Sequence, residues 1–215
     1  MDKPGWVKEI KVLVWDLDGT LYKEIPQVKA GIENKGIEVV AEANSLPLEK
    51  ARKLFFSTRE KLHSNTRTLL YLGVDREYVM SGDWFNRIQL KYLHKDTKLL
   101  AMFRQLKPLR HILSTNSNGV VARKKLKKIG VPVRNFERLF CHVDLGILKP
   151  EPEAFTIVLQ FTKLKPHEHL FIGDSEGKEM IPASKVGFRT CFVWGKSKFS
   201  DISLRTVYDT VELFN

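Results

Sequence analysis

The sequence predicts an α/β protein in which a doubly wound parallel sheet is interrupted by one long helical insertion. Short apolar runs typical of buried strands recur along the 215 residues, and several end in acidic or small polar residues. Helix-like sequence separates successive runs, as expected where crossovers join parallel strands. After the first run, the helical pattern extends over 23–98 without strand-like alternation. We therefore expect a core built from 1–22 and 99–215 and an all-helical insertion at 23–98.

The first strand is predicted at 12–15, where Val-Leu-Val-Trp stops abruptly at Asp16. Asp18 follows two positions later, with Gly19 and Thr20 behind it. Side chains alternate in extended chain, so Asp16 and Asp18 would point to the same side. Two neighbouring carboxylates repel, and Mg²⁺ is a common counter-charge because it takes carboxylate, carbonyl and water oxygens. A plain surface turn, with Asp and Gly present as turn formers, is the alternative interpretation.

The insertion carries helical periodicity, with a start near Pro47, which is tolerated at the first position of a helix. One face of this helix is marked by apolar and small residues at three- and four-residue steps from 51 to 62. Arg59, His63 and Arg67 recur at four-residue steps on a different side. These three residues either face a substrate or belong to the exposed surface.

The second predicted strand contains Ile112 and Leu113 and ends in the run Ser-Thr-Asn-Ser-Asn-Gly at 114–119. The run stands at the start of a basic helix, where free N–H groups and the helix dipole favour an anion. Hydroxyl and amide side chains are also ordinary helix caps, so this pattern alone is weak evidence for a site.

Three further strands are predicted, at 138–144, at 170–172 and at 189–194. Lys149 follows the first of these and precedes two prolines and a helix that begins near Phe155. The strand at 170–172 ends in Gly-Asp-Ser, so that Asp174 again lies just past a strand, with Glu179 five residues beyond it. Acidic and basic side chains thus gather where parallel strands end, which is where ligands bind in doubly wound sheets.

Positive charge is concentrated in 101–138, where ten basic residues face a single acid, Glu137, in a chain of net charge +11. Apolar residues at helical spacing in 121–129 leave Lys124, Lys125, Lys127 and Lys128 for the other side. We expect a solvated outer helix face. A nucleic-acid footprint is the alternative, although no recognised motif with interleaved stacking aromatics supports it.

Composition and targeting signals indicate a soluble, cytoplasmic protein. No apolar stretch approaches the length of a membrane span, and the N-terminus lacks the layout of a signal peptide. The two cysteines, Cys141 and Cys191, are flanked by apolar or aromatic residues. We expect buried reduced thiols rather than a disulfide or a metal site.

The stretch D-L-D-G-T-L at 16–21 resembles the first motif of the haloacid dehalogenase (HAD) superfamily of phosphohydrolases. The residues Thr115 and Asn116, the K-P-x-P-x-A-F stretch from Lys149, and the Gly-Asp-Ser turn at Asp174 are similar to the second, third and fourth motifs. Around Lys149 and in the insertion, the sequence looks most like the pyrimidine 5′-nucleotidase-like branch. The resemblance implies a Rossmann-like HAD catalytic core at 1–22 and 99–215 and a helical cap at 23–98, with Cys141 and Cys191 on strands at opposite edges.

The resemblance also implies a function: a Mg²⁺-dependent phosphatase that forms an aspartyl-phosphate intermediate on a nucleotide or sugar phosphate. Asp16 would be the nucleophile and Asp18 the acid and base. Thr115, Asn116 and Lys149 would bind the phosphate. Glu179 stands where the family most often has Asp, so its role is open between direct ligand, water-mediated contact and a bond to Lys149. The implied metal site is Asp16, Asp18 through its carbonyl, and Asp174, with Thr20, Ser175 and Glu179 in support.

Two alternatives to a phosphatase stay open, a phosphomutase of the same superfamily and a non-catalytic nucleic-acid-binding protein on this fold. Dehalogenation is disfavoured, because Asp18 is unnecessary for displacement at carbon. We expect a small phosphomonoester as partner, neither membrane nor nucleic acid, and a monomer or homodimer.

Overall fold

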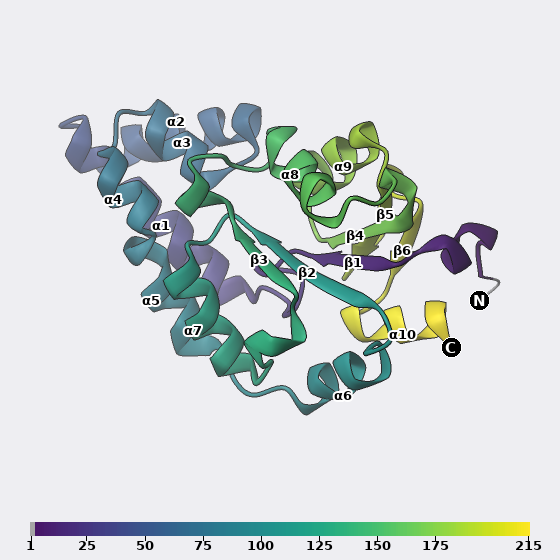
Figure 1. Ribbon diagram of the computed structural model, residues 1–215. Coiled ribbons are helices and arrows are strands. Elements are labelled where there is room, and N and C mark those ends of the chain that lie inside the picture. The colour runs from purple at the N-terminus through teal and green to yellow at the C-terminus, as the bar shows by residue number, and fades with distance from the viewer. Residues whose placement is uncertain (1–2) are drawn as a thin grey trace. The chain divides into compact units, whose positions relative to one another are not determined.

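The computed structural model describes residues 3–215, without the side chains of residues 83–85 and 87 (Figure 1). The chain divides into two compact units. One unit consists of the chain up to Lys23 together with His94–Asn215, and the other is Glu24–Leu93. The first contains the sheet and the second consists of helices.

A six-stranded parallel sheet forms the first unit, in the order β3-β2-β1-β4-β5-β6. The strand β1 is central, and Trp15 at its end pairs in register with Leu113 on one side and Ile172 on the other. All four residues of β1 are fully buried, as a strand covered on both faces by helices requires. The strands are β1 Val12–Trp15, β2 Arg110–Thr115, β3 Arg138–Cys141, β4 His169–Gly173, β5 Arg189–Val193 and β6 Ile202–Leu204.

Helices cover both faces of this sheet (Figure 1). The helices α8 and α9 lie on one face, and α6, α7 and α10 on the other. The change of face occurs between α7 and α8, where the chain crosses from β3 to β4 and the strand order reverses. The helices are α6 Thr97–Gln105, α7 Gly119–Ile129, α8 Glu153–Thr162, α9 Ile181–Val186 and α10 Thr210–Phe214. A π-helical turn, Glu176–Met180, leads into α9.

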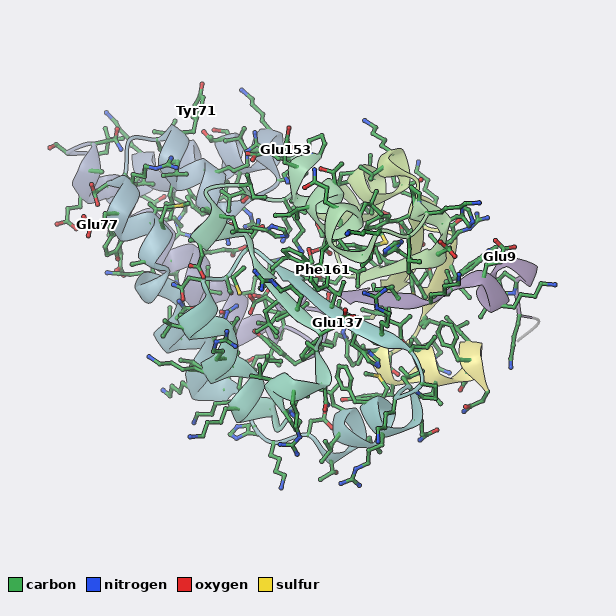
Figure 2. All side chains as sticks on the ribbon, viewed as in Figure 1. Glu9, Tyr71, Glu77, Glu137, Glu153 and Phe161 are labelled. Carbon is green, nitrogen blue, oxygen red and sulfur yellow. The ribbon has the colours of Figure 1, made fainter. Side chains whose placement is uncertain are left out.

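The second unit packs its helices around a core of its own that includes Ile37, Val40, Phe55 and Leu69. Gly36 allows α1 to approach α2 closely, because a Cβ at this position would lie 2.8 Å from the ring of Phe55. Polar and aromatic residues such as Tyr71 and Glu77 point away from this unit (Figure 2). The helices are α1 Pro26–Ala43, α2 Leu48–Leu62, α3 Asn65–Tyr71, α4 Arg76–Ser81 and α5 Asp83–Tyr92.

The sheet confirms the predicted α/β class and the predicted strands, with two corrections. The third strand ends at Cys141 rather than at residue 144, because His142–Leu145 form a 3₁₀ turn. The sequence analysis missed β6, which pairs outside β5. Cys191 therefore lies on an inner strand, contrary to the implied edge position, whereas Cys141 lies on the edge strand β3. Both thiols are free and buried.

The helical unit, 24–93, is shorter than the predicted insertion, 23–98. The difference consists of Lys23 and residues 94–98, which belong to the sheet unit. Residues 94–98 include Asp96, whose side chain caps α6, and the first two residues of that helix. Within the described part of the chain, no helix has both the length and the apolar character needed to cross a membrane.

Candidate active site

The loop after β1 brings Asp16 and Asp18 to the carboxyl end of the sheet. The N–H of Asp16 still donates to the carbonyl of Ile172 in β4, at 3.0 Å. Gly19 then adopts φ 87°, and a Cβ there would lie 2.3 Å from an Asp174 carboxylate oxygen. Only glycine fits this turn, because both its backbone conformation and its space exclude a side chain. The loop after β1 therefore packs closely against the loop after β4.

Lys149 is the cation closest to the predicted nucleophile. Its buried Nζ donates to Asp16 Oδ1 at 2.6 Å, to Glu179 Oε1 at 2.7 Å and to the carbonyl of Ser114 at 3.0 Å. Burial disfavours the charged amine, but the two carboxylates outweigh that effect and raise the pKa of Lys149 above its ordinary value. The two carboxylates therefore stabilise the charged ammonium beside Asp16.

Glu179 connects Lys149 to the turn that carries Asp174. Its second oxygen, Oε2, accepts the backbone N–H groups of Asp174 at 3.1 Å and of Ser175 at 3.2 Å. A Cβ at residue 173 would lie 2.3 Å from the same oxygen, so glycine is required there. Of the three roles left open for Glu179, the structure contains the bond to Lys149. The Ser175 hydroxyl accepts a hydrogen bond from the N–H of Lys178 at 3.4 Å and so supports the same turn.

Thr115 is the last residue of β2, and Asn116, directly after it, contacts Lys149. The Thr115 hydroxyl accepts the N–H of Ser117 at 3.1 Å, and its own hydrogen is available to an anion. The Asn116 side chain makes two bonds to the backbone of Lys149, accepting its N–H at 2.9 Å and donating to its carbonyl at 3.1 Å. Because this amide is engaged, Asn116 holds Lys149 in place, and phosphate binding by Asn116 stays a prediction.

A cluster of three carboxylates, from Asp16, Asp174 and Glu179, could hold a cation, since one oxygen of each lies within 4.8 Å of the others. Burial, with repulsion from Glu179, raises the pKa of Asp16 to about 6 and that of Asp174 to about 8. These raised pKa values indicate that the carboxylates repel one another, and a bound cation would relieve that repulsion. Thr20 completes the cluster, with its hydroxyl 3.3 Å from Asp16 Oδ2 and 3.4 Å from Asp174 Oδ1.

The Asp18 carboxylate lies outside that cluster and is held by other groups. Its Oδ1 accepts from Lys125 Nζ at 2.6 Å and from the Tyr22 hydroxyl, and its Oδ2 accepts from the Ser117 hydroxyl at 2.8 Å. Burial alone would raise the pKa of Asp18, but the Lys125 ammonium and these hydrogen bonds hold it below its ordinary value. Asp18 thus has a set of donors of its own, separate from the groups around the Asp16 carboxylate.

One part of the predicted solvated face is therefore wrong. Lys124, Lys127 and Lys128 are exposed, as expected, but Lys125 is fully buried. The helical period contains the signal that was missed, because residue 125 lies one turn from Val121 and one turn from Ile129 on the buried face. Sequence reasoning also missed Ser117 and Tyr22, whose hydroxyls donate to the Asp18 carboxylate.

Two other side chains near the site were not expected, the buried His142 and the half-buried Trp194. His142 lies next to Ser114, with its Nε2 2.8 Å from that hydroxyl, and burial together with the Lys149 charge lowers its pKa to about 3. Trp194 donates its indole N–H to the carbonyl of Thr20 at 2.9 Å and steadies the first loop. No motif marks either residue in the sequence.

Arg59, His63 and Arg67, the three residues singled out in the insertion, all belong to the helical unit. Arg59 forms an ion pair with Glu33 at 2.5 Å within that unit. His63 ends α2 in a left-handed conformation with an exposed side chain. A role for any of these residues in substrate recognition stays a prediction.

Three known proteins are similar to this chain over most of its length. A glyceraldehyde 3-phosphate phosphatase from Methanopyrus kandleri is 22% identical over 207 residues, which covers 91% of this chain and 88% of the relative. A HAD phosphatase from Thermococcus onnurineus shares the fold with a TM-score of 0.67 at 18% identity, covering 96% of this chain and 98% of the other. The HAD hydrolase YfnB from Bacillus subtilis, in a magnesium-bound crystal form, has a TM-score of 0.66 at 18% identity, with 96% and 99% covered.

The family model of haloacid dehalogenase-like hydrolases matches residues 10–187. This match includes the loop after β1, Thr115 and Asn116 at the end of β2, Lys149 and the turn at Asp174. The chain therefore belongs to the haloacid dehalogenase-like hydrolase family.

Proposed function

We propose that the protein is a Mg²⁺-dependent phosphomonoester hydrolase that works through an aspartyl-phosphate intermediate on Asp16. The observation that carries the proposal is the separation of two acids on one loop. Asp16 lies against the Lys149 ammonium and the carboxylate cluster, whereas Asp18 lies in a different set of donors. A nucleophile and a proton-transfer group need such different surroundings.

The residues present fit magnesium. The cluster offers only carboxylate oxygens, the ligands that a hard cation takes, and the raised pKa values of Asp16 and Asp174 call for a positive charge there. Asp16, Asp174 and the backbone carbonyl of Asp18 would hold the ion, with Glu179 tied to Lys149 behind them. When bound, Mg²⁺ supplies positive charge toward the phosphoryl oxygens of the substrate.

The proposed reaction has two half-reactions, in which different residues of the chain act. In the first, an Asp16 oxygen forms a bond to phosphorus and the bond from phosphorus to the leaving oxygen breaks. Asp18, protonated when the substrate is bound because the phosphate anion beside it raises its pKa, gives that oxygen its proton. In the second, Asp18 takes a proton from water as the water attacks the phosphoryl group, which releases Asp16 and phosphate. Lys149 and the Thr115 hydroxyl would bind the phosphoryl oxygens during both steps.

The second acid favours attack at phosphorus over dehalogenation at carbon. A departing halide needs no proton, so a dehalogenase would gain nothing from a carboxylate held by three donors at the position of Asp18. An alkoxide leaving from phosphorus does need one. Incubation with 2-chloropropionate should therefore release no chloride under conditions in which phosphomonoesters are hydrolysed.

For the substrate, we propose a small phosphorylated metabolite, either a sugar phosphate or a nucleotide. The printed name of the Methanopyrus kandleri relative adds glyceraldehyde 3-phosphate to the compounds worth testing. A cytoplasmic location and a monomeric or homodimeric state stay predictions from the sequence.

The test is a screen for phosphate release from sugar phosphates, nucleotides and glyceraldehyde 3-phosphate in the presence of Mg²⁺. The proposal expects turnover of at least one compound, none with the Asp16→Asn variant, and none when the wild-type protein is stripped with a chelator. Turnover by the Asp16→Asn variant would contradict the proposed nucleophile, because an amide is a very poor one.

A further inference from the structure

The helix α7 contains one lysine that does not belong to its solvated face. Lys125 has no exposed surface, whereas its neighbours Lys124, Lys127 and Lys128 are exposed. Burying an ammonium is unfavourable unless it is paired and hydrogen-bonded. The buried residues one turn away on the same face, Val121 and Ile129, are both apolar.

The contacts of Lys125 form a closed triangle with Asp18 and Ser117. Lys125 Nζ lies 2.6 Å from Asp18 Oδ1 and 3.1 Å from Ser117 Oγ, and Ser117 Oγ lies 2.8 Å from Asp18 Oδ2. An ammonium can only donate, so Ser117 accepts from Lys125 and turns its own hydrogen toward Asp18. Lys125 thus acts on both carboxylate oxygens, on one directly and on the other through Ser117.

The donors around Asp18 come from three separate segments. Tyr22 lies in the first loop, Ser117 in the turn after β2, and Lys125 in α7. Together they restrict the side-chain torsions of an aspartate whose carboxylate is still partly exposed, with 26% of the side chain accessible. Proton transfer needs a heavy-atom separation near that of a hydrogen bond, so the direction of this carboxylate determines its efficiency.

We propose that Lys125 is a positioning residue that, with Ser117, fixes the direction of the Asp18 carboxylate for proton transfer to the leaving group and from water. This inference rests on the proposed phosphatase function. Lys125 bonds to Asp18 and Ser117, whereas the carboxylate cluster consists of Asp16, Asp174 and Glu179. Removal of Lys125 should therefore slow proton transfer while leaving phosphate binding and the nucleophile in place.

The test compares Lys125→Met with a matched control, the triple variant Lys124→Gln, Lys127→Gln and Lys128→Gln. For an alkyl phosphate that the wild type hydrolyses, Lys125→Met should lower kcat by about 10- to 100-fold, the loss typical of a misdirected catalytic group. KM should change by less than about threefold, because Lys149 and Thr115 still hold the phosphoryl group. The control should stay within about threefold of wild type in both constants, since its charges are exposed and screened.

A second readout separates positioning from a general structural effect. With p-nitrophenyl phosphate, whose leaving group departs without a proton, the first half-reaction of Lys125→Met should keep its wild-type rate within about threefold. The water step still needs Asp18, so phosphorylated protein should accumulate and be visible as added mass. In Lys125→Ala, n-propylammonium should restore part of the lost alkyl phosphatase rate, and tetramethylammonium, which cannot donate, should not.

Three outcomes would overturn the inference. The first is a Lys125→Met variant with wild-type kcat on the alkyl phosphate. The second is an equal loss in both half-reactions accompanied by a lowered melting temperature, which would make Lys125 a structural anchor only. The third is a wild-type protein that hydrolyses no phosphomonoester, in which case the proposed function fails and this inference fails with it. Wild-type turnover in the same assay distinguishes the third outcome from the other two.

Discussion

Replacing Glu179 by Gln should destabilise the protein substantially, because this buried carboxylate ties two separate parts of the site together. One oxygen accepts from Lys149 and the other from the N–H groups of Asp174 and Ser175. Every neighbour is a donor, so an amide must present its NH₂ to one side and lose the bonds there. The variant keeps the shape of the side chain and removes only its charge and one acceptor.

The magnitude follows from the kind of bond that is lost. A hydrogen bond to a charged group contributes about 1.5–3 kcal/mol, and leaving a buried charge without its partner costs about 3–5 kcal/mol. Lys149 retains Asp16 and the Ser114 carbonyl in the variant, so we expect the smaller figure. A loss of about 2–3 kcal/mol corresponds to a fall in Tm of roughly 4–12 °C for a chain of this size.

Urea unfolding and thermal unfolding of Glu179→Gln measure this loss, with Glu153→Gln as the control. Glu153 is exposed at the start of α8 (Figure 2), and its substitution should change the free energy of unfolding by less than about 0.5 kcal/mol. If Glu179→Gln unfolds within 0.5 kcal/mol of wild type, on the same order as the control, the carboxylate does not hold Lys149 and the turn together.

Three further predictions concern the metal and the two loops. Removal of divalent cations should abolish phosphatase activity, and added Mg²⁺ should raise Tm in the wild type but less in Asp174→Asn; full activity after exhaustive chelation would contradict a metal requirement. Gly19→Ala should lose most activity, because its Cβ would lie 2.3 Å from an Asp174 carboxylate oxygen. Gly73→Ala is the control: Gly73 also has a positive φ, but no atom lies near its Cβ, so this variant measures the effect of the backbone conformation alone. Asn116→Ala should lower kcat by about tenfold or more, since Lys149 loses two backbone bonds and moves relative to Asp16; an unchanged kcat would show that Lys149 is held without it.

Much of the fold, and the four candidate site residues that lie near strand ends, could be predicted because the local sequence pattern and the chemistry of these residues agree. Asp16, Thr115, Lys149 and Asp174 each stand where an apolar run ends or a helix begins, and the parallel sheet brings such ends together. The role of Glu179 could not be derived in the same way. It depends on the π-helical turn at Glu176–Met180, which points the side chain back at its own loop.

The prediction that Lys125 lies on the solvated helix face failed for a different reason. Its charge indicated an exposed position, and its place in the helical period indicated a buried one; the period was correct because Asp18, far away in sequence, supplies the partner that makes burial possible. The strand β6 was missed because three residues at a sheet edge leave too short a pattern to detect. Both features depend on long-range contacts that no local window contains.

The central claim, that Asp16 forms the phosphoenzyme while Asp18 only transfers protons, is tested most directly with the Asp18→Asn variant and p-nitrophenyl phosphate. The amide oxygen can still accept from Lys125, so the loop should keep its shape, but the water step loses its base and slows by about 10²–10⁴-fold. Mixing should give a burst of about one equivalent of nitrophenolate per protein, and intact-protein mass should rise by one phosphoryl group. The Asp16→Asn variant should give neither. Absence of a burst and of added mass in Asp18→Asn, together with turnover by Asp16→Asn, would contradict the account.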